Sequence, residues 1–244
     1  MRRFFAAPEN FSENEIQLNE DESRHLRDVL RLRSGETIAV FDGAGNEFLC
    51  RIEKINRKTA TVSIIEKTAP PAPESALSLT LALALLKGEK FDLVVQKATE
   101  LGVKKIVPLE TARADVRLKD ERDAAKKVER WRRIALEAAK QSGRAFVPLI
   151  EEPIGFEDFV KSNSDDERFF FAERGGERLN QIANADFEKL TIVVGAEGGW
   201  EASEIELAGA NNLKIVTLAG RILRAETAAI AAVTLVQHLF GDLR

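Results

Sequence analysis

The feature that most constrains the fold is a stretch near the end of the chain in which strand, glycine-rich turn and helix follow one another twice. The apolar run at 190–194 leads into the turn 195–199 (Gly-Ala-Glu-Gly-Gly), and the run at 215–218 leads into the turn 220–227. If both strands lie in one parallel sheet, both turns meet at its carboxyl edge, where open α/β sheets bind ligands. The sequence therefore predicts an α/β fold with a ligand site between these turns.

A proline-rich segment separates two parts of the chain. Residues 68–75 hold three prolines within four positions, which cannot continue a sheet and favour an extended linker. Short alternating runs with tight turns precede it and predict a small β-barrel or sandwich. Strands alternate with helices after it, which predicts a mainly parallel sheet covered on both faces. We expect a first domain at 1–69, a linker at 70–75 and a second domain at 76–244.

Local patterns predict the individual elements. Phe4 and Phe5 indicate an edge strand, and residues 21–32 a short helix capped by Asn19 or Asp21. Further strands and helices are predicted, in chain order, at 37–41, 47–55, 59–65, 77–86, 91–101, 105–109, 121–142, 146–150, 169–172, 191–194, 215–218 and 223–240.

Charge is unevenly distributed along the chain. The formal net charge of −4 argues against a uniformly basic nucleic-acid-binding protein. Residues 113–144, however, carry eleven Lys or Arg against six Asp or Glu, a balance of +5 that leaves −9 for the rest. Such a basic region is typical of a phosphate-binding surface, although a solvated helix face gives the same pattern. An arginine at the end of this helix, Arg144, could bind a phosphate with two hydrogen bonds.

Several classes of protein are disfavoured by what the sequence lacks. It has no G-x-G-x-x-G after a strand, no Walker A loop, no HExxH and no G-x-S-x-G motif. One cysteine, Cys50, allows no internal disulfide, and with His25 and His238 it is too small a set for a structural metal site. The N-terminal apolar run is too short for a signal peptide, and no run suits a transmembrane helix. We expect a cytoplasmic protein without metal.

The two turns carry the groups most suited to chemistry. Glycine lets backbone N–H and C=O groups approach a ligand closely, although a tight turn without a ligand needs glycine as well. Arg224 and Glu226 could pair with each other, cap the last helix, or face the same cleft. Two charged, glycine-rich turns at one sheet edge favour a nucleotide-like ligand.

Short motifs recur in a characteristic order along the whole chain. They are residues 2–5 (Arg-Arg-Phe-Phe), 25–31 (His-Leu-Arg-Asp-Val-Leu-Arg), Gly35, Lys87, 96–103 (Gln-Lys-Ala-Thr-Glu-Leu-Gly-Val), Pro108, 130–131, 137–144 (Glu-Ala-Ala-Lys-Gln-Ser-Gly-Arg), Pro148, 195–199 and 221–228. In this order they resemble the SPOUT-superfamily RNA methyltransferases, and within them the bacterial 16S ribosomal RNA uridine N3-methyltransferases (RsmE family). The family usually has proline where this chain has Ala196, which leaves that turn less restricted.

The resemblance implies a fold and a cofactor. It implies a PUA-like β-barrel that helps to hold RNA at 1–69, and a SPOUT α/β domain with a trefoil knot at 76–244. It also implies a homodimer that binds S-adenosyl-L-methionine and methylates N3 of a uridine in 16S ribosomal RNA. The assembled small subunit is the expected substrate, and naked RNA stays open as the alternative. The cofactor-binding residues carried over by position are Gly195, Gly199, Leu218, Gly220, Ile222, Leu223 and Arg224.

The chemistry of uracil suggests the catalytic residues. N3 of uracil carries a proton, so a base must remove it or the resulting anion must be stabilised. Glu197 and Glu226 are the candidates for base or orienting residue, and Arg224 and Arg144 are the candidates for stabilising the uracil oxygens or binding phosphate. Candidates for RNA contacts are Arg2, Arg3, Arg27, Arg31, Arg130, Arg133, Gln141 and Arg144.

Three other functions remain open at this point. A non-catalytic RNA-binding assembly protein would keep the basic helix but would not need residues 220–227 intact. Another SPOUT specificity, such as transfer-RNA methylation, is disfavoured by the N-terminal barrel and the Arg-Arg-Phe-Phe start. A nucleotide-binding metabolic enzyme would differ by its lack of tight RNA binding.

Overall fold

A computed structural model describes residues 1–162, 165–182, 187–218 and 220–243. Their contacts divide the chain into two compact units: Met1–Glu74 with Ala139–Val147, and Ser75–Ala138 with Pro148–Arg244. The domain ranges expected from the sequence place residues 139–147 in the second part of the chain, whereas their contacts in the structure are with the first. Among the described residues, no helix is long and apolar enough to cross a membrane.

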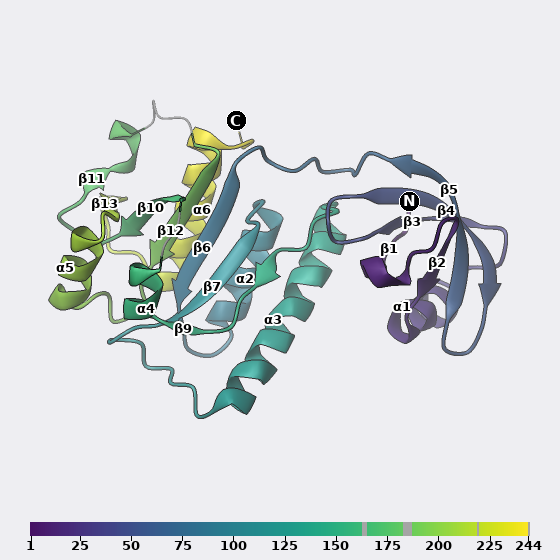
Figure 1. The fold of residues 1–244 in the computed structure, drawn as a ribbon, viewed down its shortest axis with the longest axis horizontal. Coiled ribbons are helices and arrows are strands. Elements are labelled where there is room, and N and C mark those ends of the chain that lie inside the picture. Colours follow the sequence, from purple (N-terminus) through teal and green to yellow (C-terminus); the bar gives the residue numbers. More distant parts are fainter. Residues whose placement is uncertain (163–164, 183–186, 219, 244) are drawn as a thin grey trace. The chain divides into compact units, whose positions relative to one another are not determined.

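The first unit contains a five-stranded sheet with the strand order β1-β3-β4-β5-β2 (Figure 1). β1 pairs with β3 in parallel, and the other neighbours are antiparallel. Its elements are β1 (Arg3–Phe5), η1 (Pro8–Asn10), β2 (Glu15–Leu18), α1 (Glu20–Arg24), the π-helical turn η2 (His25–Val29), β3 (Thr37–Phe41), β4 (Glu47–Ile55) and β5 (Ala60–Thr68). Apolar side chains from the strands and from Leu26 of η2 form its core.

The sequence predicts most of this unit. β1 is an edge strand as expected, β3 and β4 have the predicted bounds, and Asn19 caps α1 by accepting a hydrogen bond from the N–H of Glu22 at 2.9 Å. The predicted helix at 21–32 is too long, because the α-helix changes to the π-helical turn at His25 and the turn ends at Val29. β2 was not predicted.

Two ion pairs and the hydrogen bonds of one arginine hold residues 139–147 on the first unit. Arg3 binds Glu47 at 2.6 Å and donates further hydrogen bonds to the carbonyls of residues 139, 140 and 144. Arg144, only 3% exposed, binds both carboxylate oxygens of Glu74 at 2.9 and 2.6 Å. Lys140 binds the buried Glu22 at 2.7 Å. These contacts explain why the segment belongs to the first unit although it is far from it in sequence.

The second unit is an α/β structure with a parallel sheet in the order β11-β13-β10-β12-β6-β7-β8, and β9 also pairs with β7. Its elements are β6 (Ser78–Ala84), α2 (Lys90–Glu100), β7 (Lys105–Glu110), α3 (Glu121–Ser142), β8 (Leu149–Ile150), β9 (Ile154–Gly155), α4 (Phe156–Lys161), β10 (Glu167–Phe171), β11 (Glu177–Arg178), η3 (Leu179–Gln181), β12 (Lys189–Val194), α5 (Ala202–Ala210), β13 (Lys214–Thr217) and α6 (Ala225–Phe240). The expected α/β class is confirmed, and α4, β9 and β11 were not predicted.

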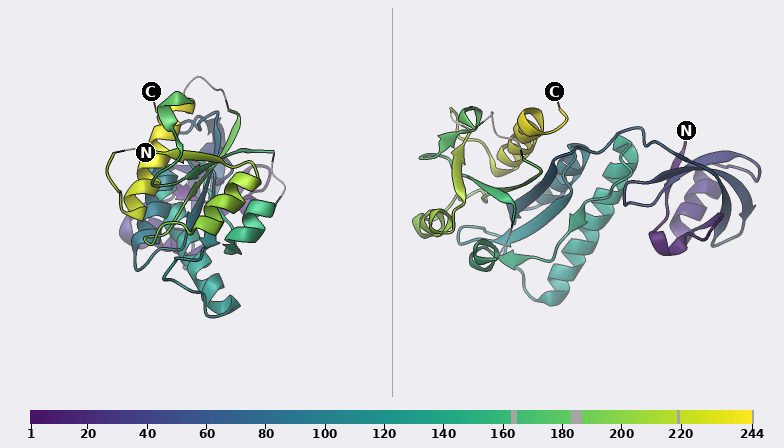
Figure 2. Two further views of the ribbon diagram at one scale, coloured as in Figure 1. Left: turned by 90° about the vertical axis from the view of Figure 1, so that its left-hand side faces the viewer. Right: turned by 45° about the horizontal axis from the view of Figure 1, so that its top comes forward.

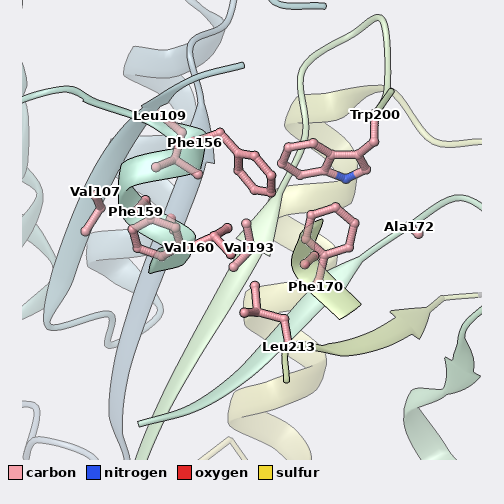
Figure 3. Packing of buried hydrophobic residues seen from close by; sticks show 12 residues of the cluster. Val107, Leu109, Phe156, Phe159, Val160, Phe170, Ala172, Val193, Trp200 and Leu213 are labelled. Carbon is pink, nitrogen blue, oxygen red and sulfur yellow. The ribbon is translucent and has the colours of Figure 1, made fainter. Parts of the chain in front are cut away.

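Helices cover both faces of this parallel sheet. α4 and α5 lie on one face, and α2 and α6 pack together on the other (Figures 1 and 2). Neighbouring residues of β10 show the alternation: Phe169 meets Phe240 of α6, whereas Phe170 packs against Trp200 on the opposite face, with ring centroids 4.4 Å apart. Figure 3 shows Trp200 and Phe170 with Phe156 of α4 in the core of that face.

The ion pair of the buried Arg144 with the half-buried Glu74 gives a test of how the first unit is held together. We expect Arg144→Met to lower the free energy of unfolding by about 3 kcal/mol, because it leaves the Glu74 carboxylate without its buried partner. Arg133→Met, which removes an exposed arginine from α3, the helix that precedes Arg144, should change it by less than about 0.5 kcal/mol. Denaturant unfolding of both full-length variants measures the difference, and equal effects would contradict a structural role for Arg144.

Candidate functional site

Four adjacent strands of the second unit end at the same edge of the sheet. β6, β12, β10 and β13 are neighbours in that order, and all their pairings are parallel. The turn 195–199 follows β12 and the second glycine turn follows β13, so both lie at the carboxyl edge as predicted. β10 lies between them, and its end contributes residues that the sequence did not mark.

A cavity of about 410 Å³ opens between these strand ends. Six of the seven predicted cofactor-binding residues line it: Gly195, Gly199, Leu218, Gly220, Ile222 and Leu223. Glu197 lines it too, together with Glu173, Arg174, Gly176 and Arg178 from the segment after β10. Arg224 and Glu226 are not among the lining residues. Arg224 is the exposed N-cap residue of α6, and its carbonyl accepts the N–H of Ala228 at 2.8 Å.

The indole of Trp200 leaves no room for a side chain at position 195. Trp200 is buried, and its Nε1 donates a hydrogen bond to the carbonyl of Phe171 at 2.9 Å, which fixes the ring. A Cβ at position 195 would lie 2.9 Å from Cε2 of this ring, closer than real Cβ contacts. Gly195 therefore lets the end of β12 pack directly on the indole while its backbone lines the cavity.

The rest of the first turn closes tightly. The N–H of Gly199 donates to the carbonyl of Ala196 at 3.0 Å, and Gly199 has φ +67°, a conformation that side chains disfavour. Ala196 is buried. The turn thus forms with alanine at the position where the family usually has proline.

A lysine that is not among the candidate residues predicted from the sequence joins the two candidate acids. Nζ of Lys90, the first residue of α2, lies 2.9 Å from Oε1 of Glu197 and 3.7 Å from Oε2 of Glu226. The backbone N–H of Lys87 also donates to Oε1 of Glu197 at 3.3 Å. Oε2 of Glu197 and Oε2 of Glu226 are buried without a hydrogen-bond donor among the described residues. One ammonium therefore bridges the two glycine turns.

This arrangement sets the charge of Glu197. Burial raises the pKa of Glu197, but the hydrogen bond from Lys90, backbone hydrogen bonds and the ammonium charge together outweigh burial and bring the pKa below its ordinary value. The hydrogen bond with Glu197 raises the pKa of Lys90, and the charge of Arg224 opposes that rise. At neutral pH the site therefore holds an ionised carboxylate beside a protonated amine.

The predicted RNA-contact residues divide by exposure. Arg2, Arg31, Arg130, Arg133 and Gln141 are exposed, and Arg130 pairs with Asp92. Arg27 is half-buried and binds Asp28 at 2.7 Å. Arg3 binds the buried Glu47 and backbone carbonyls, and the buried Arg144 binds the half-buried Glu74, both inside the first unit. That burial counts against the phosphate or uracil contact expected for Arg3 and Arg144.

The sequence did carry a signal for Lys90. Residues 84–90 repeat the pattern of the two glycine turns, because β6 ends, Gly88 follows, and a helix begins at Lys90. No comparable signal marks Glu173 or Arg178, which reach the cavity from a segment without a regular helix. Within the described part of the chain, no group of His, Cys, Asp and Glu side chains could hold a metal ion.

Comparison with known proteins identifies the class of protein to which this chain belongs. Residues 73–237 match the family model of the RNA methyltransferase domain, and residues 18–65 match the RNA methyltransferase PUA domain. Ribosomal RNA small subunit methyltransferase E of Rickettsia conorii is 35% identical over 235 residues, which cover 93% of this chain and 91% of that protein. The Bacillus subtilis protein of the same name is 30% identical over 232 residues, covering 92% and 90%.

Solved structures support the same class of protein. A ribosomal RNA small subunit methyltransferase E from Neisseria gonorrhoeae bound to S-adenosyl methionine superposes with a TM-score of 0.89 at 34% identity, covering 100% of both chains. A Legionella pneumophila protein in complex with the cofactor SAM gives 0.89 at 31% identity, covering 100% of this chain and 99% of the other. Fold and matches together define an RNA methyltransferase with a PUA domain. More narrowly, the chain belongs to the ribosomal RNA small subunit methyltransferase E family.

These findings confirm the family resemblance and the PUA-like and α/β fold predicted from the sequence, and S-adenosylmethionine is the cofactor that two neighbours hold. The trefoil knot, the homodimer and the residue roles stay predictions. The cavity suits this cofactor. Its volume is within the range of small-molecule sites, roughly 300–1,000 Å³. Apolar side chains such as Leu218 and Leu223 can cover an adenine ring, and the carboxylates of Glu173 and Glu197 favour a cationic sulfur.

The contact between Gly195 and Trp200 leads to a prediction about ligand binding. We expect Gly195→Ala to lower stability by about 1–3 kcal/mol through overpacking and to weaken S-adenosylhomocysteine binding, because the indole or the turn must move. The control is Gly209→Ala on α5, where an added Cβ meets nothing within 4 Å. It should keep affinity and raise stability by up to about 1 kcal/mol. Calorimetry and thermal unfolding measure both, and unchanged affinity in Gly195→Ala would contradict the account.

Proposed function

We propose that the protein transfers the methyl group of S-adenosylmethionine to N3 of a specific uridine in 16S ribosomal RNA of the small ribosomal subunit. The observation that carries this proposal is the cavity between two glycine turns, with an ionised carboxylate, Glu197, on its wall. Membership of the family and the names of the relatives support the substrate class. The atom and the nucleoside rest on the resemblance and on the chemistry of the site.

The cavity residues have a binding role in this mechanism. S-adenosylmethionine supplies an electrophilic methyl group on a positively charged sulfur. The backbones of Gly195, Gly199 and Gly220 line the cavity without side chains in the way, so a ligand can approach them closely. Leu218, Ile222 and Leu223 cover apolar ligand surface. Such in-line transfer depends mainly on orientation, so a rigid cavity contributes more than any single contact.

Glu197 is the proposed base. Oε1 of Glu197 is occupied by Lys90 and by the N–H of Lys87, whereas its buried Oε2 has no hydrogen-bond donor among the described residues. An N3–H group of uracil is a donor that fits this oxygen. Removal of that proton frees the N3 electron pair for the methyl group, and general-base catalysis is typically worth about 10²- to 10⁴-fold. Glu226 orients the cluster, and the exposed guanidinium of Arg224 stabilises negative charge on the uracil oxygens.

The exposed basic residues are the proposed RNA contacts. A uridine in folded RNA must be unstacked to enter a site, which costs a few kcal/mol. Arg130 and Arg133 on α3 of the second unit, and Arg2 and Arg31 of the first, offer phosphate contacts that offset this cost. We further propose that the active form is a homodimer that acts on the assembled subunit.

Labelled methyl transfer tests the proposal. Purified protein is incubated with labelled S-adenosylmethionine and small ribosomal subunits that lack their own modification, and the RNA is digested to nucleosides. We expect label in 3-methyluridine. Label in another nucleoside would contradict the specificity while keeping the enzyme class. Absence of transfer to any RNA would contradict the proposed activity and favour a non-catalytic binding protein.

The same assay identifies the base. Glu197→Gln keeps the size of the side chain but cannot accept the proton, so turnover should fall by roughly 10²-fold or more while S-adenosylhomocysteine still binds. Glu206→Gln on α5, an exposed acid of the same unit, is the matched control and should keep full turnover. Equal turnover in the two variants would exclude Glu197 as the base.

A further inference from the structure

Lys90 is the one lysine in the described part of the chain that lies within 4 Å of two carboxylates from the two glycine turns. It is the first residue of α2, directly after the end of β6. Glu197 belongs to the turn after β12, and Glu226 to the first turn of α6, which follows the turn after β13. Three separate strand ends therefore meet at a single ammonium group.

The burial of this cluster makes the bridge more than a surface ion pair. The side chains of Lys90, Glu197 and Glu226 are 33%, 21% and 14% exposed. Their charges are screened less than those of the neighbouring pair Lys87–Asp115, whose side chains are 59% and 55% exposed. Without Lys90, two carboxylates would face each other in a partly desolvated site, and they would separate or one would take up a proton.

Lys90 contacts the two carboxylates unequally. Glu197 receives a direct hydrogen bond on Oε1, while its Oε2 is buried without a hydrogen-bond donor among the described residues; Glu226 approaches Lys90 only to 3.7 Å. A hydrogen bond to one oxygen of a carboxylate fixes the rotation of the group and so aims the other oxygen. Glu226 shares the ammonium charge and so ties the second turn to the first.

We propose that Lys90 is a positioning residue for methyl transfer, which joins the two glycine turns through Glu197 and Glu226 and aims the free oxygen of Glu197 at the proton of the substrate uridine. This role rests on the proposed function of Glu197 as the base. Lys90 acts through the carboxylates and does not line the cofactor cavity. It should therefore affect turnover far more than cofactor binding.

The variants are Lys90→Met, which removes the charge and keeps the chain length, and Lys90→Arg, which keeps the charge. The matched control is Lys97→Met. Lys97 lies on the same helix, is 38% exposed, and binds Glu100 at 2.9 Å, the distance of Lys90 to Glu197. Each full-length variant is measured by thermal unfolding, by calorimetric titration with S-adenosylhomocysteine, and by single-turnover methyl transfer to small subunits across a pH series.

We expect Lys90→Met to bind S-adenosylhomocysteine within a few-fold of the wild type while the transfer rate falls roughly 10- to 100-fold. Lys90→Arg should recover part of that rate, and Lys97→Met should match the wild type. The groups facing position 90 are Glu197, Glu226 and Arg224, with Lys87 and Asp115 nearby. Burial raises the pKa of Glu197, and Lys90 lowers it. Without the lysine the pKa of Glu197 therefore rises, and the acid limb of the pH–rate profile moves to higher pH.

Two results would overturn the role of Lys90 while the proposed function stands. One is wild-type rate and pH profile in Lys90→Met. The other is a loss of ligand affinity or folding in Lys90→Met that accounts for its whole loss of rate and that Lys90→Arg shares, which would make Lys90 a structural residue only. No methyl transfer by the wild-type protein would instead overturn the proposed function, and this role with it.

Discussion

The parallel pairing of β6, β12, β10 and β13 is the constraint on which the rest of the second unit depends. Because the four strands run in one direction, their carboxyl ends converge, and each is followed by a segment that contributes to the site. β12 and β13 supply the two glycine turns, β10 supplies Glu173, and β6 supplies Lys90. Packing keeps these ends in place, since Trp200 lies on Gly195 and bonds to the carbonyl that ends β10.

Charged residues perform two different tasks in this protein. Arg3, Lys140 and Arg144 are buried or nearly so, and each pairs with a carboxylate of the first unit. They hold the end of α3 and the following residues on that unit, and their basic character is structural. Arg130 and Arg133 on the same helix are exposed, which suits contacts with a polyanion. A count of positive charge along residues 113–144 cannot separate these tasks, because it contains no information on burial.

Local sequence patterns predict the structural features that are determined by residues close together in the chain. The bounds of β3, β4 and α3 agree with the predicted ranges, and the two turns lie at one sheet edge as their strand–turn–helix order requires. The position of β10 between β12 and β13 follows from pairing between distant segments, which no local pattern encodes. The same is true of Lys90, whose partners lie more than a hundred residues away. The two-residue strands β9 and β11 are too short to give a periodic signal.

The proposed function requires that the cavity between the two glycine turns holds the cofactor, with Glu197 at its wall. A crystal structure of this protein with S-adenosylhomocysteine tests it most directly. We expect ligand density between residues 195–199 and 218–223, with the ligand sulfur on the side of the cavity that faces Glu197. Density elsewhere on the chain, or a sulfur turned away from Glu197 with no room for a uracil ring between them, would contradict it.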